Sequence, residues 1–266
     1  MSEKITVWII GMAKHSRMLE AMNALPLPEQ ARARKYKKKE HGLWWAYVRS
    51  STREILAKYC ACAPTNIEFS ESEFGKPFLD YPNYSQLIFN VSHTQNIALV
   101  AVSQNSQTSI NHKDVTEGVN NTNSADCIKM ALGVDIESVK PMSDMTMVAS
   151  RFFSLKENAF LKNAATEQKL DTFYSIWTKK EALIKAHGKG LGIDLTAFCT
   201  ADVDSNTWHS IMFEGENYRM TELNLPNDIA LSPHKAALCL KVPKSNEIGA
   251  EYMQLNHLAH HLRQHK

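Results

Sequence analysis

The stretch that decides the fold reads Leu87-Ile-Phe-Asn-Val-Ser-His-Thr-Gln-Asn-Ile-Ala-Leu-Val-Ala-Val102. Both of its ends, Leu87–Ser92 and Ile97–Val102, are rich in residues that favour β-strands. The four residues between them are polar and suit a short connection. We therefore expect an antiparallel hairpin, and the flanking segments indicate what that hairpin belongs to.

Upstream of the hairpin the sequence predicts two kinds of element. Ile5–Ile10 has the length and apolar character of a strand and ends at Gly11. Residues 29–59 carry spaced apolar side chains among many charges, which predicts a long helix. A short strand is expected near Ile67–Phe69, before a turn that contains Gly75-Lys76-Pro77.

Downstream, Ser103–Cys127 is dominated by Asn, Ser, Thr and Gln. Such a segment cannot bury enough apolar surface to order itself, which predicts a flexible insertion. A strand is expected over Ala131–Val139, and a polar helix after Lys244. Between these we expect helices at 144–153, 156–165 and 170–187, then strands at 208–213, 218–223 and 236–242.

Helices and antiparallel strands thus occur on both sides of the polar segment. This order predicts an α+β protein with two lobes of similar size. We expect an N-terminal lobe over 1–104, the polar inserted loop over 105–127 and a C-terminal lobe over 128–266.

Composition excludes several classes of protein. The chain has 266 residues and a net charge of +2, which is too small to indicate a nucleic-acid partner. The apolar run Ile5–Ile10 is too short for a signal peptide, and no other run is long enough to span a bilayer. The five cysteines are scattered and odd in number, which argues against a disulfide framework or a zinc site. We expect a cytoplasmic monomer with reduced cysteines and no membrane or nucleic-acid partner.

Two acidic residues are the first chemical signal. In Gly133-Val-Asp-Ile-Glu137, Asp135 and Glu137 lie two residues apart on a predicted strand, so they share a face about 7 Å apart. Two such carboxylates can hold one hard cation, and magnesium prefers oxygen ligands of this kind. A solvated strand face is the alternative.

The second signal is a helix that reads Trp177-Thr-Lys-Lys-Glu-Ala-Leu-Ile-Lys-Ala-His-Gly-Lys-Gly190. Trp177, Glu181 and Lys185 lie on one stripe of this helix. An exposed Glu–Lys pair kept for solubility is the usual interpretation, but a tryptophan on a charged stripe is unusual. The glycines of Gly188–Gly192 can end the helix or let a ligand approach closely.

Three further fragments are weaker signals. Ser92 and His93 end a strand, where they can contact a phosphate; as neighbours on a strand they point to opposite faces, which argues against a nucleophile–base pair. Lys76 adds a single cation in a turn. The basic run Arg32–Lys39 is either a solvated helix face or a contact for phosphate or nucleic acid.

The order and spacing of these fragments, with Arg151-Phe-Phe-Ser154 between the two acidic motifs, closely resemble the Sfp-type 4′-phosphopantetheinyl transferases. The resemblance extends from about Pro28 to about Leu195. It implies two α+β lobes related by pseudo-twofold symmetry, with coenzyme A in the cleft between them. It also implies magnesium-dependent transfer of the 4′-phosphopantetheine group from coenzyme A to a serine of an apo acyl or peptidyl carrier protein. Adenosine 3′,5′-bisphosphate is the released product of this holo-[acyl-carrier-protein] synthase activity.

The resemblance also implies roles for individual residues. The magnesium ligands would be Asp135, Glu137 and Glu181. The 3′-phosphate and adenosine end of coenzyme A would meet Lys76, Ser92 and His93, and in the basic run Arg32 is the first candidate for a further phosphate contact. Lys185 would bind the pyrophosphate, and Glu181 is either a metal ligand or the general base. The family usually joins its two lobes by a short connection, so Ser103–Cys127 is an insertion that departs from the family pattern.

Two other functions use part of this residue set. A metal-dependent nuclease or phosphohydrolase also needs clustered acids and a lysine. The common nuclease pattern places that lysine two residues after the second acid, where this chain has Val139. A non-catalytic module that binds coenzyme A or a carrier protein would be expected to lack one of the three carboxylates. The sequence does not indicate which carrier protein or pathway is served.

Overall fold

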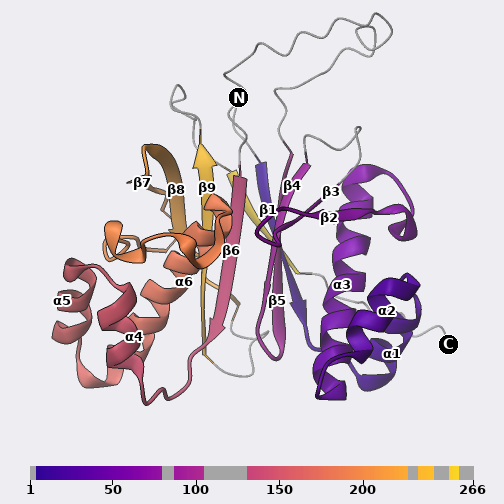
Figure 1. Ribbon diagram of the computed structural model, residues 1–266, viewed down its shortest axis with the longest axis horizontal. Coiled ribbons are helices and arrows are strands. Elements are labelled where there is room, and N and C mark those ends of the chain that lie inside the picture. The colour runs from indigo at the N-terminus through magenta and orange to yellow at the C-terminus, as the bar shows by residue number, and fades with distance from the viewer. Residues whose placement is uncertain are drawn as a thin grey trace, which may run out of the picture.

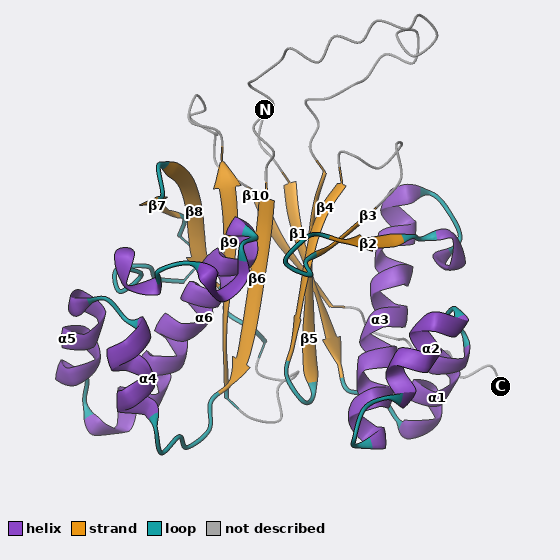
Figure 2. Ribbon diagram, in the orientation of Figure 1, coloured by secondary structure: helices purple, strands orange, loops and turns teal. Residues whose placement is uncertain are grey.

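The structure is a computed structural model that describes residues 4–79, 87–104, 131–205, 207–226, 233–242 and, for the backbone alone, 252–257. Two four-stranded sheets lie in the middle of the molecule, and helices cover the outer face of each (Figure 1, Figure 2). The inner faces pack against each other through apolar side chains such as Val7, Leu99, Val134 and Leu238. The predicted α+β class is therefore confirmed.

The first sheet and its helices come mostly from the N-terminal part of the chain. The predicted hairpin is present, with Val91 of one strand opposite Val100 of the other. The strands follow the order β10-β1-β5-β4. The elements of this part are β1 (Lys4–Gly11), α1 (His15–Asn23), α2 (Leu27–Arg34), α3 (Lys39–Cys60), the 3₁₀ turn η1 (Pro64–Asn66), β2 (Phe69–Glu71), β3 (Pro77–Leu79), β4 (Leu87–His93) and β5 (Ile97–Gln104).

Three predictions need correction in this part. The single helix expected over 29–59 is two helices, because the chain turns at residues 35–38 between α2 and α3. Helix α1 was not predicted. Ser103 and Gln104, which we counted with the polar insertion or at its border, belong to β5, and Ser103 pairs with Ile5 and Ile88. The remainder of the predicted insertion, 105–127, lies outside the described residues.

The second sheet follows the predicted elements closely. Its strands are antiparallel in the order β6-β9-β8-β7. The elements are β6 (Ala131–Ser138), α4 (Met145–Phe152), α5 (Leu155–Asn163), η3 (Thr166–Gln168), α6 (Lys169–His187), η4 (Gly190–Gly192), η5 (Leu195–Ala197), β7 (His209–Phe213), β8 (Glu216–Glu222) and β9 (His234–Val242).

The C-terminal segment departs from the prediction. We expected a helix after Lys244, whereas β10 (Tyr252–His257) is a strand that pairs in parallel with β1 of the first sheet. The predicted C-terminal lobe of 128–266 therefore gives one strand to the opposite sheet. Pairing explains the difference, because β10 satisfies an edge of β1 that would otherwise present unpaired backbone groups.

Helix α6 lies unusually close to β6. A Cβ atom added at Gly133 would lie 2.0 Å from the carbonyl oxygen of Ala182 and 2.4 Å from the backbone nitrogen of Ala186. Only glycine permits this approach of helix backbone to strand backbone. The contact brings the second half of α6, which carries Glu181 and Lys185, beside Asp135 of β6.

A buried ion pair fixes α6 from its other side. The ammonium of Lys180 and the carboxylate of Glu157 are 2.8 Å apart, and both side chains are fully buried. Lys180 also donates to the Leu195 carbonyl, and Glu157 accepts from the backbone nitrogen of Thr200. Because every charged group here has partners, the network joins α5, α6 and the chain after η5.

The described residues can be compared with two predictions made from composition, on membrane spans and on disulfides. No helix among them is long and apolar enough to cross a membrane. The four cysteines that the structure describes are free thiols, and Cys127 lies outside the described residues.

Candidate active site between the two sheets

Asp135 is the centre of the candidate site. Its side chain is buried, with 4% of the residue exposed. One carboxylate oxygen, Oδ1, accepts hydrogen bonds from the Ser92 hydroxyl at 2.9 Å and from the Lys185 ammonium at 2.7 Å. The other oxygen, Oδ2, is buried and has no hydrogen-bond partner among the described residues. A buried charged oxygen is costly to leave unpaired, so this oxygen is suited to bind a cation or a donor from a ligand.

Glu181 lies close enough to Asp135 for the charge of Asp135 to raise its pKa. Burial raises the pKa of Glu181, and Asp135 and then Glu137 raise it further, while Lys185 lowers it; the result is about 7. The pKa of Glu137 is also raised, mainly by burial and then by Asp135, while a hydrogen bond from Trp177 lowers it. The three predicted acids thus share one electrostatic environment.

The fit of this acidic group to a metal ion is partial. Among the described residues, no three His, Cys, Asp or Glu side chains form a group that could hold a metal ion as they stand. The donor set nevertheless suits magnesium, because the free Asp135 oxygen is buried and Glu137 and Glu181 add further carboxylate oxygens. The Lys185 ammonium occupies Oδ1 of Asp135 in this arrangement.

The stability of the metal-free protein should depend on pH through Glu181. Its pKa is about 7 in the folded chain, against an ordinary value of 4.5, so the folded state binds the additional proton between these pH values. Stability should therefore fall as pH rises through this window, and Glu181→Gln should remove that loss. We expect the wild type to lose between about 1 and 3 kcal/mol more than Glu181→Gln between pH 4.5 and pH 8.

Urea unfolding of both proteins in a chelator, at several pH values, measures this difference. Comparison with the glutamine variant cancels the contributions of groups that do not interact with Glu181. Parallel pH profiles for the two proteins would contradict the assignment of a raised pKa to Glu181.

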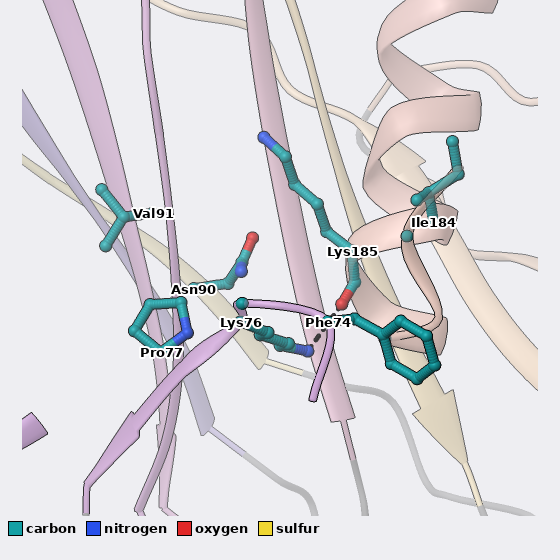
Figure 3. A pocket seen from close by; sticks show the side chains of 10 residues that line it. Phe74, Lys76, Pro77, Asn90, Val91, Ile184 and Lys185 are labelled. Atoms are coloured by element: carbon teal, nitrogen blue, oxygen red, sulfur yellow. Dashed lines mark hydrogen bonds between the residues drawn. The ribbon is translucent and has the colours of Figure 1, made fainter. Parts of the chain in front are cut away.

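A cavity of about 220 Å³ lies beside the acidic group. Its walls come from the β2–β3 turn, β4 and the C-terminal end of α6, through Phe74, Gly75, Lys76, Pro77, Asn90, Val91, Ile184, Lys185, Gly188 and Gly190 (Figure 3). Gly188 ends α6 with a φ of 89°, which confirms the predicted helix end. The space around Gly75, Gly188 and Gly190 is open, because a Cβ added at any of them would meet no atom within 4 Å.

Lys76 spans the two halves of the molecule at this cavity. Its ammonium donates to the Leu132 carbonyl at 2.9 Å and to the Lys185 carbonyl at 2.6 Å, and Figure 3 draws the second bond. Burial lowers the pKa of Lys76 to about 8. Two of its three donors are therefore engaged by the backbone, which leaves one for a ligand.

Among the described residues, neither His93 nor Arg32 shares a hydrogen bond with the three acids. His93 is exposed at the end of β4, and its Nδ1 lies 3.4 Å from the Thr94 carbonyl oxygen. Loss of solvation lowers the pKa of His93. The hydrogen bond to the Thr94 backbone raises this pKa in part, and the charge of Lys185 lowers it further. Arg32 pairs with Glu71 at 3.3 Å and lies over the Trp45 ring. In the described part of the chain it shares no hydrogen bond with any other predicted site residue.

Sequence reasoning assigned no role to Asn90 or Lys180 and left one signal unexplained. Asn90 lies in the quoted Phe-Asn-Val-Ser-His segment but received no role, although its side chain bonds the backbone of Val134. Lys180 adjoins Glu181 but is a buried structural residue. The tryptophan on the charged stripe, Trp177, packs against Phe152 and Phe173 and bonds Glu137, so that unusual position was the available signal.

Comparison with known proteins matches both halves of the chain. A model of the 4′-phosphopantetheinyl transferase N-terminal region matches residues 12–105, and a model of the 4′-phosphopantetheinyl transferase superfamily matches residues 131–239. The 4′-phosphopantetheinyl transferase HetI of Nostoc sp. is 32% identical over 193 residues, which cover 72% of this chain and 71% of HetI.

Two relatives from Bacillus subtilis are more distant. One 4′-phosphopantetheinyl transferase is 28% identical over 189 residues, covering 71% of this chain and 70% of the relative. The 4′-phosphopantetheinyl transferase Sfp of strain 168 is 29% identical over 146 residues, covering 55% and 52%. These matches agree with the motif spacing, and the chain belongs to the 4′-phosphopantetheinyl transferase superfamily.

Proposed function

We propose that this enzyme transfers the 4′-phosphopantetheine group of coenzyme A to a serine of an apo acyl or peptidyl carrier protein, with magnesium as its cofactor. Adenosine 3′,5′-bisphosphate leaves. The observation that carries this proposal is Asp135, a buried carboxylate beside Glu137, Glu181 and Lys185. One of its oxygens has no hydrogen-bond partner in the part of the chain that the structure describes. Family membership supports the reaction class.

The acidic residues would hold the metal ion, with Asp135 binding through Oδ2. Bound magnesium supplies positive charge that offsets the charge developing on the pyrophosphate. Lys185 has 27% of its side chain exposed and uses two donors, on Asp135 and on the Val134 carbonyl. Its third donor would contact the phosphate of the departing nucleotide.

Glu181 is suited to take the proton of the carrier serine. In the metal-free protein the pKa of Glu181 is about 7, raised mainly by burial, and a general base works best when its pKa lies near the operating pH. The serine oxygen forms a bond to the phosphorus that carries the pantetheine arm, and the phosphoanhydride bond to the nucleotide breaks. The serine proton passes to Glu181, and the bond electrons leave with adenosine 3′,5′-bisphosphate.

The cavity would receive one part of coenzyme A. Its volume of about 220 Å³ lies below the range of roughly 300–1,000 Å³ for sites that enclose drug-sized ligands. The remainder of the substrate would lie along the open side, toward His93. In this arrangement Lys76 and His93 contact the 3′-phosphate end. Ser92 contributes through Asp135, because its hydroxyl is already engaged there, and Arg32 remains a more distant phosphate contact.

The two lobes would be related by a pseudo-twofold axis, each with a sheet and helices on its outer face. We propose that the enzyme acts as a cytoplasmic monomer. The proposed N-terminal lobe spans 1–104 and the C-terminal lobe starts at 128, with the loop 105–127 between them.

Replacing His93 should weaken coenzyme A binding more than catalysis. Losing one charge-assisted phosphate contact should cost about 1.5–3 kcal/mol, roughly 10- to 150-fold in affinity. Calorimetry should therefore give this loss for His93→Ala with coenzyme A and little loss with dephospho-coenzyme A. Gln95→Ala, an exposed residue in the same turn, is the matched control. If His93→Ala binds coenzyme A and dephospho-coenzyme A more weakly by the same factor, His93 does not contact the 3′-phosphate.

Mass spectrometry of apo carrier proteins tests the function itself. After incubation with the enzyme, coenzyme A and magnesium, the carrier should gain the mass of one phosphopantetheine group. A carrier with its acceptor serine replaced by alanine, and a reaction in chelator, should show no gain. Binding of coenzyme A without any transfer to a panel of carriers would favour the non-catalytic module. Cleavage of nucleic acid or phosphate esters would favour the hydrolase.

A further inference from the structure

Strand β6 has an unusual edge. It is the first strand of its sheet, with β9 on one side and no strand of the described chain bonded to the other. The backbone groups on a free edge need partners or they invite pairing with other chains. This edge faces β4 of the opposite sheet, and side chains rather than a strand satisfy it.

Side chains from the site motifs bond the β6 backbone at alternate residues. The amide oxygen Oδ1 of Asn90 accepts from the Val134 N–H at 2.8 Å, and the Ser92 hydroxyl accepts from the Ile136 N–H at 3.4 Å. Asn90 and Ser92 are two residues apart on β4, as Val134 and Ile136 are on β6. Alternate residues lie on the same side of a strand, so the spacing of the two side chains on β4 equals the spacing of the two backbone groups on β6.

Two lysines complete the same edge. Lys76 donates to the Leu132 carbonyl at 2.9 Å, and Lys185 donates to the Val134 carbonyl at 3.2 Å. We call these contacts, made by Lys76, Asn90, Ser92 and Lys185, the β6 seam. Three of these side chains are also assigned to substrate or metal chemistry above. Asn90 is the member without such a role, and only 4% of it is exposed.

We propose that Asn90 is a positioning residue for Asp135. Its bond to Val134 fixes the backbone one residue before Asp135, and Ser92 fixes the backbone one residue after it while donating to Oδ1. The inference rests on the proposed function, because Asp135 matters here as a metal ligand. An asparagine suits the position, since it supplies a neutral acceptor next to a group of three carboxylates that already repel one another.

Loss of the Asn90 acceptor should weaken the β6 seam directly beside Asp135. The Val134 N–H would become a buried donor without a partner, which the strand can relieve only by moving. Displacing a catalytic group by about 1 Å can cost a hundredfold in rate. The Asp135 carboxylate should then be less well placed to bind the same ion as Glu137 and Glu181. We therefore expect a larger effect on metal affinity than on the stability of the remaining fold.

The variant Asn90→Leu tests this inference, because leucine has a similar size and no acceptor. Amide hydrogen exchange of metal-free protein should be at least about tenfold faster at Val134 in Asn90→Leu than in wild type. Calorimetry in saturating coenzyme A should give about 10- to 100-fold weaker magnesium binding, the range typical of lost support for a metal ligand. Thr52→Val is the control, because it removes a buried hydroxyl that bonds only within α3.

A rescue variant separates positioning from direct contact with substrate, since Asn90 also lines the cavity. Asn90→Asp keeps an acceptor oxygen, so it should restore slow exchange at Val134 even though its charge alters metal binding. If Asn90→Leu does not fold, Asn90→Ala carries the same expectations without apolar bulk.

The possible outcomes distinguish this inference from the proposed function. Slow exchange at Val134 in Asn90→Leu, or magnesium binding as strong as in Thr52→Val, would overturn the positioning role. Failure of the wild type to bind magnesium or modify any carrier would instead overturn the proposed function. The exchange measurement would still report whether Asn90 holds β6.

Discussion

Asp135→Asn is expected to abolish phosphopantetheine transfer while the protein stays folded. The amide oxygen can still accept from Ser92 and Lys185, so the hydrogen bonds to Oδ1 survive. The amide nitrogen then replaces Oδ2, the buried oxygen that no described residue contacts by a hydrogen bond, and a donor cannot bind a cation. Losing this ligand should lower the rate about a thousandfold, the equivalent of roughly 4 kcal/mol of transition-state stabilisation.

Steady-state transfer assays across a range of magnesium concentrations measure this loss, with unfolding curves to show that the fold is intact. Glu181→Ala should lose transfer to a similar degree, because Glu181 is a proposed ligand and base. Glu137→Gln should lose less if Glu137 binds the ion through water. Normal turnover by Asp135→Asn at ordinary magnesium concentrations would remove Asp135 from the metal site.

Gly133→Ala is expected to be the most damaging substitution for stability. The new methyl group would lie 2.0 Å from the Ala182 carbonyl oxygen and 2.4 Å from the Ala186 nitrogen, both in the backbone of α6. A rigid helix backbone cannot move aside as a flexible side chain can, so α6 must shift from β6. We expect a loss of at least about 3 kcal/mol, at the upper end for overpacked cores, against a total stability of roughly 5–15 kcal/mol.

Gly11→Ala is the matched control, because it adds the same methyl group on another strand where no atom lies within 4 Å. It should leave the melting temperature nearly unchanged, whereas Gly133→Ala should lower it by roughly 6–12 °C or yield no soluble protein. Urea and thermal unfolding of both variants provide the comparison. Equal stabilities would show that α6 can move from β6 at little cost, and the close approach would not position Glu181 and Lys185.

The two results bear on the same geometry. Gly133 brings α6 onto β6, and Asp135 lies two residues further along that strand. A partly folded Gly133→Ala protein should therefore also lose magnesium affinity, because Glu181 and Lys185 move with the helix. The proposed site would thus depend on the packing of α6 on β6 as much as on the identity of its proposed ligands.

The sequence by itself determined the elements whose signals are local. Residues that favour strands, separated by a short polar connection, specified the β4–β5 hairpin. Alternating apolar residues specified β6, because the strand period of two places them on a buried face. The helical period and the glycine at its end specified α6. The spacing of the motifs identified the family, since the combination of Gly-Lys-Pro, Ser-His, Asp-x-Glu and Lys-Glu segments is far more specific than any one of them.

Only the tertiary structure decided which side chains meet. Ser92 and Asp135 are bonded across 43 residues of sequence, and Lys185 and Asp135 across 50, so no local pattern could pair them. The sequence places Lys180 on a helix, but it does not show that this lysine is buried. Its burial depends on the ion pair with Glu157, which comes from another helix. Strand β10 was misread as a helix because its structure depends on the free edge of β1, at the opposite end of the chain. The bond from the Val134 N–H to Asn90 forms because no strand of the described chain pairs with that edge of β6, and because the packing of the two sheets brings β4 beside it.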